Sequence, residues 1–190
     1  GAIALTAKST LHIDGPAWFY SNEAKGNGGA IFLEYESTIH IDGPVSFYSN
    51  EAKDNGGAIY ASDSSLFVEN GTQFVYNVAA TASGGGVYSL RAVVSLKEAT
   101  FTGNSGVWGG GVAHFSSGSL WDDKVDNSGP ANVTGCTFDG NQATDGGAIY
   151  SSAGYDMVVN SSFSGNVARR RTRWCPPALR RTSGVDREFI

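Results

Sequence analysis

Short alternating runs of apolar residues, separated by Gly, Pro, Ser and Asn, repeat along the chain. In residues 29–56 the runs are GAIFL, STIHID and VSFYSN, and every second residue of each run is apolar. Alternation with a period of two places the apolar side chains of a β-strand on one face, and β-branched and aromatic residues favour strands. No apolar stripe with the helical period of about 3.6 residues is present. The pattern therefore predicts three short strands in each unit.

The unit recurs with a period of about 28 residues. Residues 1–28 match residues 29–56 at most positions without a gap, and further units open at Gly57 and Gly85. Two motifs persist as the rest of the unit diverges, GG-[AG]-[IV] and F-x-x-N. The copies of F-x-x-N begin at Phe19, Phe47, Phe74, Phe101, Phe138 and Phe163. Self-similarity at a fixed period of this length is the signature of a solenoid.

Three strands of about five residues, with their turns, make one coil of a β-helix, and each coil lies about 4.8 Å above the last. We predict an all-β fold, a single-stranded right-handed parallel β-helix of about six coils like that of the pectate lyases. Like residues then stack on like, and the motif Phe, Ile and Val side chains should form interior ladders. The paired Gly should make tight corners, and the motif Asn side chains should form a hydrogen-bonded ladder at turns.

The repeats divide the chain into an array and a tail. We predict that residues 1–168 form the β-helix. The step from Val112 to Ile149 is longer than the others, and the excess falls in a polar loop at 116–130. This loop is expected to be a surface insertion, or alternatively a contact site, because loops often carry function. Residues 169–190 lack both motifs and are expected to be a disordered or non-native extension, with a basic tail for an anionic surface as the alternative.

Charge and cysteine content exclude several classes of function. The chain carries a formal net charge of −5, and the seven Arg of residues 169–190 leave the first 168 residues strongly acidic. Nucleic acids are bound by clustered Lys and Arg, so nucleic acid is not an expected partner. No apolar run of about 18 residues is present, and no membrane span is expected. Cys136 and Cys175 make neither a disulfide framework nor a metal-ligand spacing.

The pairing of GGA[IV] with F-x-x-N at this spacing resembles the repeats of the chlamydial polymorphic membrane proteins. Related repeats occur in other bacterial and protist surface proteins, and the resemblance covers about residues 1–168. In the chlamydial family the array is a passenger domain displayed at the outer membrane as an adhesin. The resemblance therefore implies an extracellular location at the cell surface, associated with the outer membrane or cell envelope. The opening residues GAIAL look like the middle of a repeat, so we expect the chain to be part of a longer protein.

Parallel β-helices also include polysaccharide lyases and hydrolases, whose active sites need clustered carboxylates. His12 and Asp14, like His40 and Asp42, are two residues apart and should share an outer face, where the repeat period stacks the two pairs. The aligned residues of the next two coils are Phe67, Glu69, Ser95 and Lys97. Such divergence is typical of a solvated charged face, and we assign no catalytic residue.

No metal or cofactor site is predicted either. Asp122, Asp123 and Asp126 lie close together in the insertion, but their spacing fits no calcium-binding loop. His114 stands apart from the other two histidines, and the sequence implies no partner for it.

Outward aromatic residues are the best candidates for a binding site. Alternation turns the residue after each inward Ile or Val outward, and on three successive coils these residues are Phe32, Tyr60 and Tyr88. The equivalent residues of the following coils are Ala113 and Tyr150, and a neighbouring strand offers Tyr20 and Tyr48. Exposed aromatic columns bind sugars or protein partners, so we predict ligand binding by Phe32, Tyr60 and Tyr88. The alternative is a stacked ladder that only covers the sheet.

These observations predict a non-catalytic, surface-displayed or secreted β-helix module that acts as an adhesin or stalk. Its expected partners are a glycan or a cell-surface protein. Self-association through uncapped ends is a further expectation, because open sheet edges pair with other strands. The alternative function is a scaffold within a carbohydrate-active β-helix enzyme of the lyase or hydrolase type.

Overall fold

The structure, a computed structural model, describes residues 1–116, 129–152 and 156–169. This part of the chain contains β-strands and no helix, and therefore no helix that could cross a membrane. Most of the predicted insertion at 116–130 and of the predicted tail at 169–190 lies outside the described residues.

Three parallel sheets, here named A, B and C, each receive one strand from every coil. Sheet A contains β1 (Ile3–Leu5), β5 (Ile31–Leu33), β9 (Ile59–Ser62), β13 (Val87–Leu90), β16 (Val112–Phe115) and β20 (Ile149–Ser152). Sheet B contains β2 (Thr10–Asp14), β6 (Thr38–Asp42), β10 (Ser65–Glu69), β14 (Val93–Lys97), β17 (Ala131–Thr134) and β21 (Met157–Val159). Sheet C contains β3 (Ala17–Tyr20), β7 (Val45–Tyr48), β11 (Gln73–Val75), β15 (Thr100–Thr102), β18 (Thr137–Asp139) and β22 (Ser162–Ser164).

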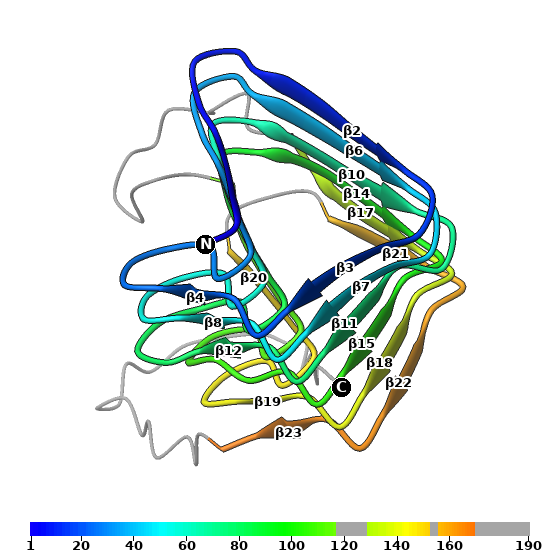
Figure 1. Ribbon diagram of the computed structural model, residues 1–190. Coiled ribbons are helices and arrows are strands. Elements are labelled where there is room, and N and C mark those ends of the chain that lie inside the picture. The colour runs from blue at the N-terminus through cyan, green and yellow to red at the C-terminus, as the bar shows by residue number, and fades with distance from the viewer. Residues whose placement is uncertain (117–128, 153–155, 170–190) are drawn as a thin grey trace, which may run out of the picture.

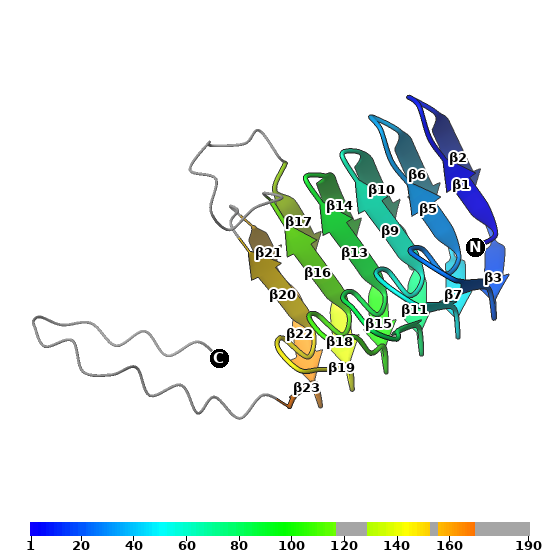
Figure 2. The ribbon, with the colours of Figure 1, turned by 90° about the vertical axis from the view of Figure 1, so that its left-hand side faces the viewer.

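The coils stack in a single row, with the first coil at one end and the sixth at the other (Figures 1 and 2). After sheet C the chain forms a loop in each coil, and these loops, here named the corner loops, project beside sheet A (Figure 1). In five of the coils the corner loop contains a short strand. These short strands are β4 (Glu23–Ala24), β8 (Glu51–Ala52), β12 (Val78–Ala79), β19 (Gln142–Ala143) and β23 (Val167–Ala168). The predicted parallel β-helix is confirmed, and its right-handed sense stays a prediction.

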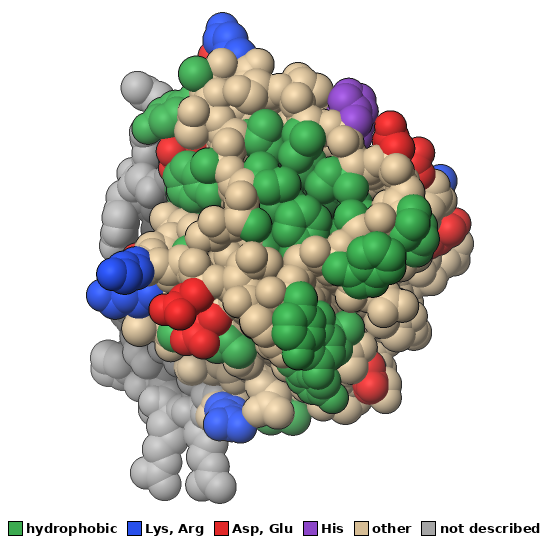
Figure 3. All heavy atoms as spheres, in the orientation of Figure 1, with side chains coloured by type: hydrophobic (Ala, Val, Ile, Leu, Met, Phe, Trp, Pro, Cys, Tyr) green, Lys and Arg blue, Asp and Glu red, His purple; other side chains and the backbone are tan. Residues whose placement is uncertain are grey.

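A ladder of phenylalanine rings fills the interior behind sheet C. The motif Phe residues pair in register along the sheet, and adjacent ring centroids lie 4.6 to 5.1 Å apart in nearly parallel planes. The four rings of the middle coils are fully buried, whereas Phe163 in the sixth coil is 50% exposed. Each coil therefore completes its core only against a neighbour, as the repeat pattern predicted. Figure 3 shows apolar side chains gathered on the face formed by the first coil.

The motif asparagines form the predicted ladder, and those of the four middle coils are fully buried. The backbone N–H and the Nδ2 amide of Asn50 both donate to Oδ1 of Asn77, at 3.0 and 2.9 Å. The same amide donates to the carbonyl of Phe19 at 2.9 Å. Because the buried amide finds partners in the coils on both sides, the cost of removing it from water is offset.

The two glycines of the GG motif have different roles. Gly56 has a φ of +70°, a left-handed conformation that residues with a side chain rarely adopt. Gly57 lies where coils meet, and a Cβ on it would be 2.2 Å from the carbonyl oxygen of Gly85. The first glycine therefore allows the corner to turn, and the second allows the backbones to approach.

Candidate functional site

The predicted binding residues form a stacked column on the outer face of sheet A. Phe32, Tyr60 and Tyr88 lie on β5, β9 and β13 in register. The ring centroids of Phe32 and Tyr60 are 5.2 Å apart, and those of Tyr60 and Tyr88 are 5.3 Å apart, with interplanar angles of 8° and 2°. We name this column, with the residues that extend it below, the aromatic ladder.

Two aromatic residues that sequence reasoning missed extend the ladder past Ala113. Ala113 pairs with Tyr88 on one side and Tyr150 on the other, and its small side chain leaves space between the two rings. The ring of Phe115 occupies that space, with its centroid 5.5 Å from Tyr88 and 5.4 Å from Tyr150. Trp108, from a corner loop, packs 6.0 Å from Phe115 and 5.8 Å from Tyr150.

Only one of these two residues left a usable signal in the sequence. Phe115 is two residues beyond Ala113 and therefore faces outward by the same alternation. Trp108 belongs to no alternating run, so its position depends on how the corner loop folds. The alternating pattern of the strands does not predict the path of that loop.

A groove of about 360 Å³ separates the aromatic ladder from the corner loops. It is lined by Asn55, Thr81, Ala82, Ser83, Tyr88, Val107, Trp108 and Phe115. The corner-loop wall is tied together by amides, since the N–H of Ser83 donates to Oδ1 of Asn55 at 3.1 Å. All of the lining side chains are uncharged, so the groove suits a ligand that brings no unpaired charge.

The rings of the ladder present their edges and hydroxyl groups, because their faces are covered by the neighbouring rings. Tyr60 is only 7% exposed, whereas Trp108 is 40% exposed. Burial, with a smaller contribution from Tyr60, raises the pKa of Tyr88 to about 12. Both tyrosines are therefore neutral hydrogen-bonding groups at physiological pH. Trp108 offers the larger apolar contact.

Charged residues stand at the margin of the ladder. The Arg91 guanidinium donates from Nε and Nη2 to the two carboxylate oxygens of Asp63, each at 2.6 Å. This hydrogen bonding lowers the pKa of Asp63, against the opposing effect of burial. Burial, and next the nearby charge of Asp63, raise the pKa of Glu34. The Arg91–Asp63 ion pair links two neighbouring coils at the end of sheet A, where the chain leaves β9 and β13 toward sheet B.

The histidine and aspartate pairs lie where the repeat period placed them. The rings of His12 and His40 stack at 4.7 Å, and His40 stacks on Phe67 at the same distance. Asp14 and Asp42 lie beside them along a shallow groove of about 330 Å³ on sheet B. Asp42 also accepts a hydrogen bond from Asn70. Within the described ranges, no three His, Cys, Asp or Glu side chains are grouped to hold a metal ion.

The sequence implied no partner for His114, and the structure places three polar side chains around its imidazole. It is fully buried on the inner face of β16, with Nδ1 2.7 Å from Oγ of Ser89. Its Nε2 lies 3.2 Å from Oγ of Ser116 and 3.5 Å from Oδ1 of Asp156. Burial lowers the pKa of His114, while Asp156 and the backbone of Gly129 act in the opposite direction. Solvent does not reach the ring, so the cluster is a polar part of the core.

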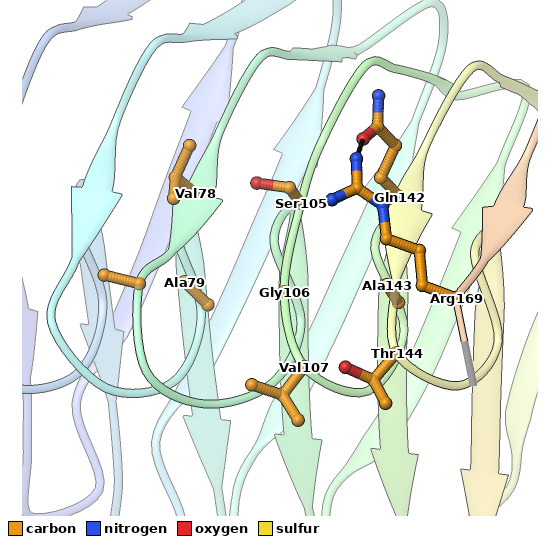
Figure 4. A pocket seen from close by; sticks show the side chains of 10 residues that line it. Val78, Ala79, Ser105, Gly106, Val107, Gln142, Ala143, Thr144 and Arg169 are labelled. Atoms are coloured by element: carbon orange, nitrogen blue, oxygen red, sulfur yellow. Dashed lines mark hydrogen bonds between the residues drawn. The ribbon is translucent and has the colours of Figure 1, made fainter. Parts of the chain in front are cut away.

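A second recess lies along the corner loops at the fourth coil (Figure 4). The loop there is short, and Ser105 forms only an isolated bridge between Val78 and Gln142. The recess holds about 270 Å³ and has Val107 along its floor. Arg169 reaches back from the sixth coil to hydrogen-bond with Oε1 of Gln142 (Figure 4). Arg169 and Gln142 both line the recess (Figure 4).

The family model of the Chlamydia polymorphic membrane protein repeat matches three stretches of the chain, at residues 19–34, 44–62 and 135–152. Each stretch contains an F-x-x-N motif and the GG motif that follows it. No curated protein and no solved structure matches the chain. The β-solenoid and the matched repeats fit a surface-displayed module, and the three matched stretches are similar to the Chlamydia polymorphic membrane protein repeat.

Proposed function

We propose that the chain is a non-catalytic module, displayed at the cell surface, that binds a partner protein in the groove between the aromatic ladder and the corner loops. The family of the repeat supports a location at the surface or outer membrane. The carrying observation is the uncharged groove lined in part by Trp108, a large and partly exposed side chain on a rigid scaffold. Tryptophan and tyrosine are enriched among the residues that dominate protein interfaces.

The geometry of the rings favours a protein over a glycan at this groove. A sugar ring stacks on an aromatic face, and in the groove the ring of Tyr88 already packs against Tyr60 on one side and Phe115 on the other. Apolar side chains of a polypeptide can instead pack against ring edges and against the indole of Trp108. Backbone groups of the same polypeptide can bond with the amide and hydroxyl groups of Asn55 and Ser83.

Cell binding by the parent chain, by a groove variant and by a control variant tests this proposal. The labelled 190-residue chain is added to cultured epithelial cells, with and without prior protease treatment of the cells. The variant Trp108→Ala should weaken binding at least tenfold, and protease treatment should remove it. The control is Tyr35→Ala, which alters an exposed aromatic residue outside the groove, at the turn after β5. Binding that survives both Trp108→Ala and protease, or no binding to cells at all, would refute a protein-binding groove.

A further inference from the structure

The outer face of sheet C exposes a second group of aromatic rings, in the first three coils. Trp18 is 75% exposed, Tyr20 67% and Tyr76 54%, and Tyr48 lies among them at 36%. The rings of Tyr20 and Tyr48 stack at 5.2 Å, and Tyr76 meets Tyr48 edge-on at 5.9 Å. These rings are far more exposed than Tyr60 in the aromatic ladder.

The second group differs from the aromatic ladder because ring faces remain uncovered. Trp18 pairs in register with Ser46, whose small side chain cannot cover the indole face on that side. Tyr76 lies over Gly103, since a Cβ on this glycine would be 2.4 Å from Cε1 of the ring. The Tyr76 ring therefore packs against the backbone at Gly103 and stays 54% exposed. Exposed indole and phenol rings thus accompany the outer face of sheet C.

The surface beside these rings is uncharged and rich in hydrogen-bonding groups. The residues that continue the column of Trp18 along sheet C are Ser46, Gln73, Thr100, Thr137 and Ser162. Among the outward residues of the described sheet C strands, the only charged one is Asp139, in the fifth coil. Hydroxyl and amide groups both donate and accept hydrogen bonds, as sugar hydroxyls require. They recur at each coil, about 4.8 Å apart.

We propose that this face of sheet C, centred on Trp18 and Tyr76, binds a neutral oligosaccharide. The apolar face of a sugar ring packs on the indole, while Ser46 and Gln73 bond the hydroxyl groups at the edge of that sugar and of the next one. A sulfated or sialylated chain is disfavoured, because the outward residues of the described sheet C strands include no cation and residues 1–168 are strongly acidic. This site is separate from the groove on sheet A, so each can be lost without the other.

Binding to an array of oligosaccharides tests the proposal. The 190-residue chain is applied to neutral oligosaccharides of several linkages and to sulfated and sialylated oligosaccharides, and hits are titrated by calorimetry. We expect binding to neutral chains only. Trp18→Ala should lower the affinity at least tenfold, whereas the control Tyr35→Ala, at an exposed aromatic residue outside sheet C, should leave it unchanged. Because Trp18 is mostly exposed, the variant should melt at the temperature of the parent.

A second pair of variants tests the open face itself. Ser46→Tyr places a ring beside Trp18, in the register in which Tyr48 covers Tyr20, and should abolish sugar binding while Trp18 remains. Ser46→Ala leaves the face open and should cost no more than a few-fold. The proposal is overturned if no neutral oligosaccharide binds, if only charged ones bind, or if Trp18→Ala and Ser46→Tyr leave the affinity unchanged. Loss of cell binding in Trp108→Ala with sugar binding retained would support the groove independently.

Discussion

Removal of one interior ring should destabilise the chain by an amount set by its place in the ladder. Phe101 is fully buried, and its centroid lies 4.6 Å from that of Phe74 and 4.8 Å from that of Phe138. A third neighbour is Gly86, which has no side chain to move into the space that Phe101→Ala would leave. The substitution loses the transfer free energy of the ring and adds a cavity, which together cost about 3–5 kcal/mol.

Phe163→Ala is the matched comparison. This ring has its stacking partner on one side, Phe138 at 5.1 Å, and half of its surface is exposed. Its removal opens little enclosed space and should cost roughly 1 kcal/mol. The same chemical change therefore has two expected magnitudes, and the difference depends only on whether a coil has neighbours on both sides.

Thermal unfolding followed by circular dichroism measures both effects. For a chain of this size, 1 kcal/mol shifts Tm by about 2–4 °C, so Phe101→Ala should lower Tm by about 6–20 °C and Phe163→Ala by about 2–4 °C. Because a coil contacts only its neighbours, a weakened fourth coil uncouples the coils on its two sides. The thermal unfolding transition of Phe101→Ala should therefore also broaden or split. An unchanged melt for Phe101→Ala, or equal shifts for the two variants, would refute the stacking argument.

Three further predictions test the buried polar groups and the corners. Burial lowers the pKa of His114 below that of an unfolded histidine, so the parent should lose stability as pH falls below about 6.5. Urea titrations at pH 7.5 and 5.5 should show a smaller loss of unfolding free energy in His114→Asn than in the parent. Asn77→Ala removes the acceptor of two bonds from Asn50 and should cost about 1–3 kcal/mol for each donor left unpaired, measured as the shift in urea midpoint. Gly57→Ala would press a methyl group against a carbonyl oxygen 2.2 Å away, and we expect a loss of about 3 kcal/mol or more, visible as poor soluble yield and a lower Tm. A normal melt for Gly57→Ala would contradict the close approach of the corners.

The sequence predicted the parts of the structure that each coil repeats. Alternation fixes which way a strand residue points, and the period fixes which residue lies above it, so the columns of Phe101 and of Tyr60 could be read directly. The ring of Phe115 over Ala113 depends on a side chain leaning along its strand, and Trp108 depends on the path of a loop. Ser89 pairs with His114 in register, but the third side-chain partner, Asp156, lies beyond the insertion, where the period fails. None of these three contacts is encoded in a local pattern.

The asparagine ladder has a consequence for how such a chain can evolve. Successive partners are 28, 27, 27, 37 and 25 residues apart, yet every link repeats the same pair of bonds at 2.9 to 3.0 Å. The hydrogen bonds of the ladder thus do not depend on the number of residues in a coil. A whole coil can be copied, lengthened or deleted, and the asparagines on either side still bond to each other. The match between residues 1–28 and 29–56, which are identical at 20 of 28 positions, is the mark of such a duplication. Selection can therefore vary the length of the array and the loops it displays while the core is inherited unchanged.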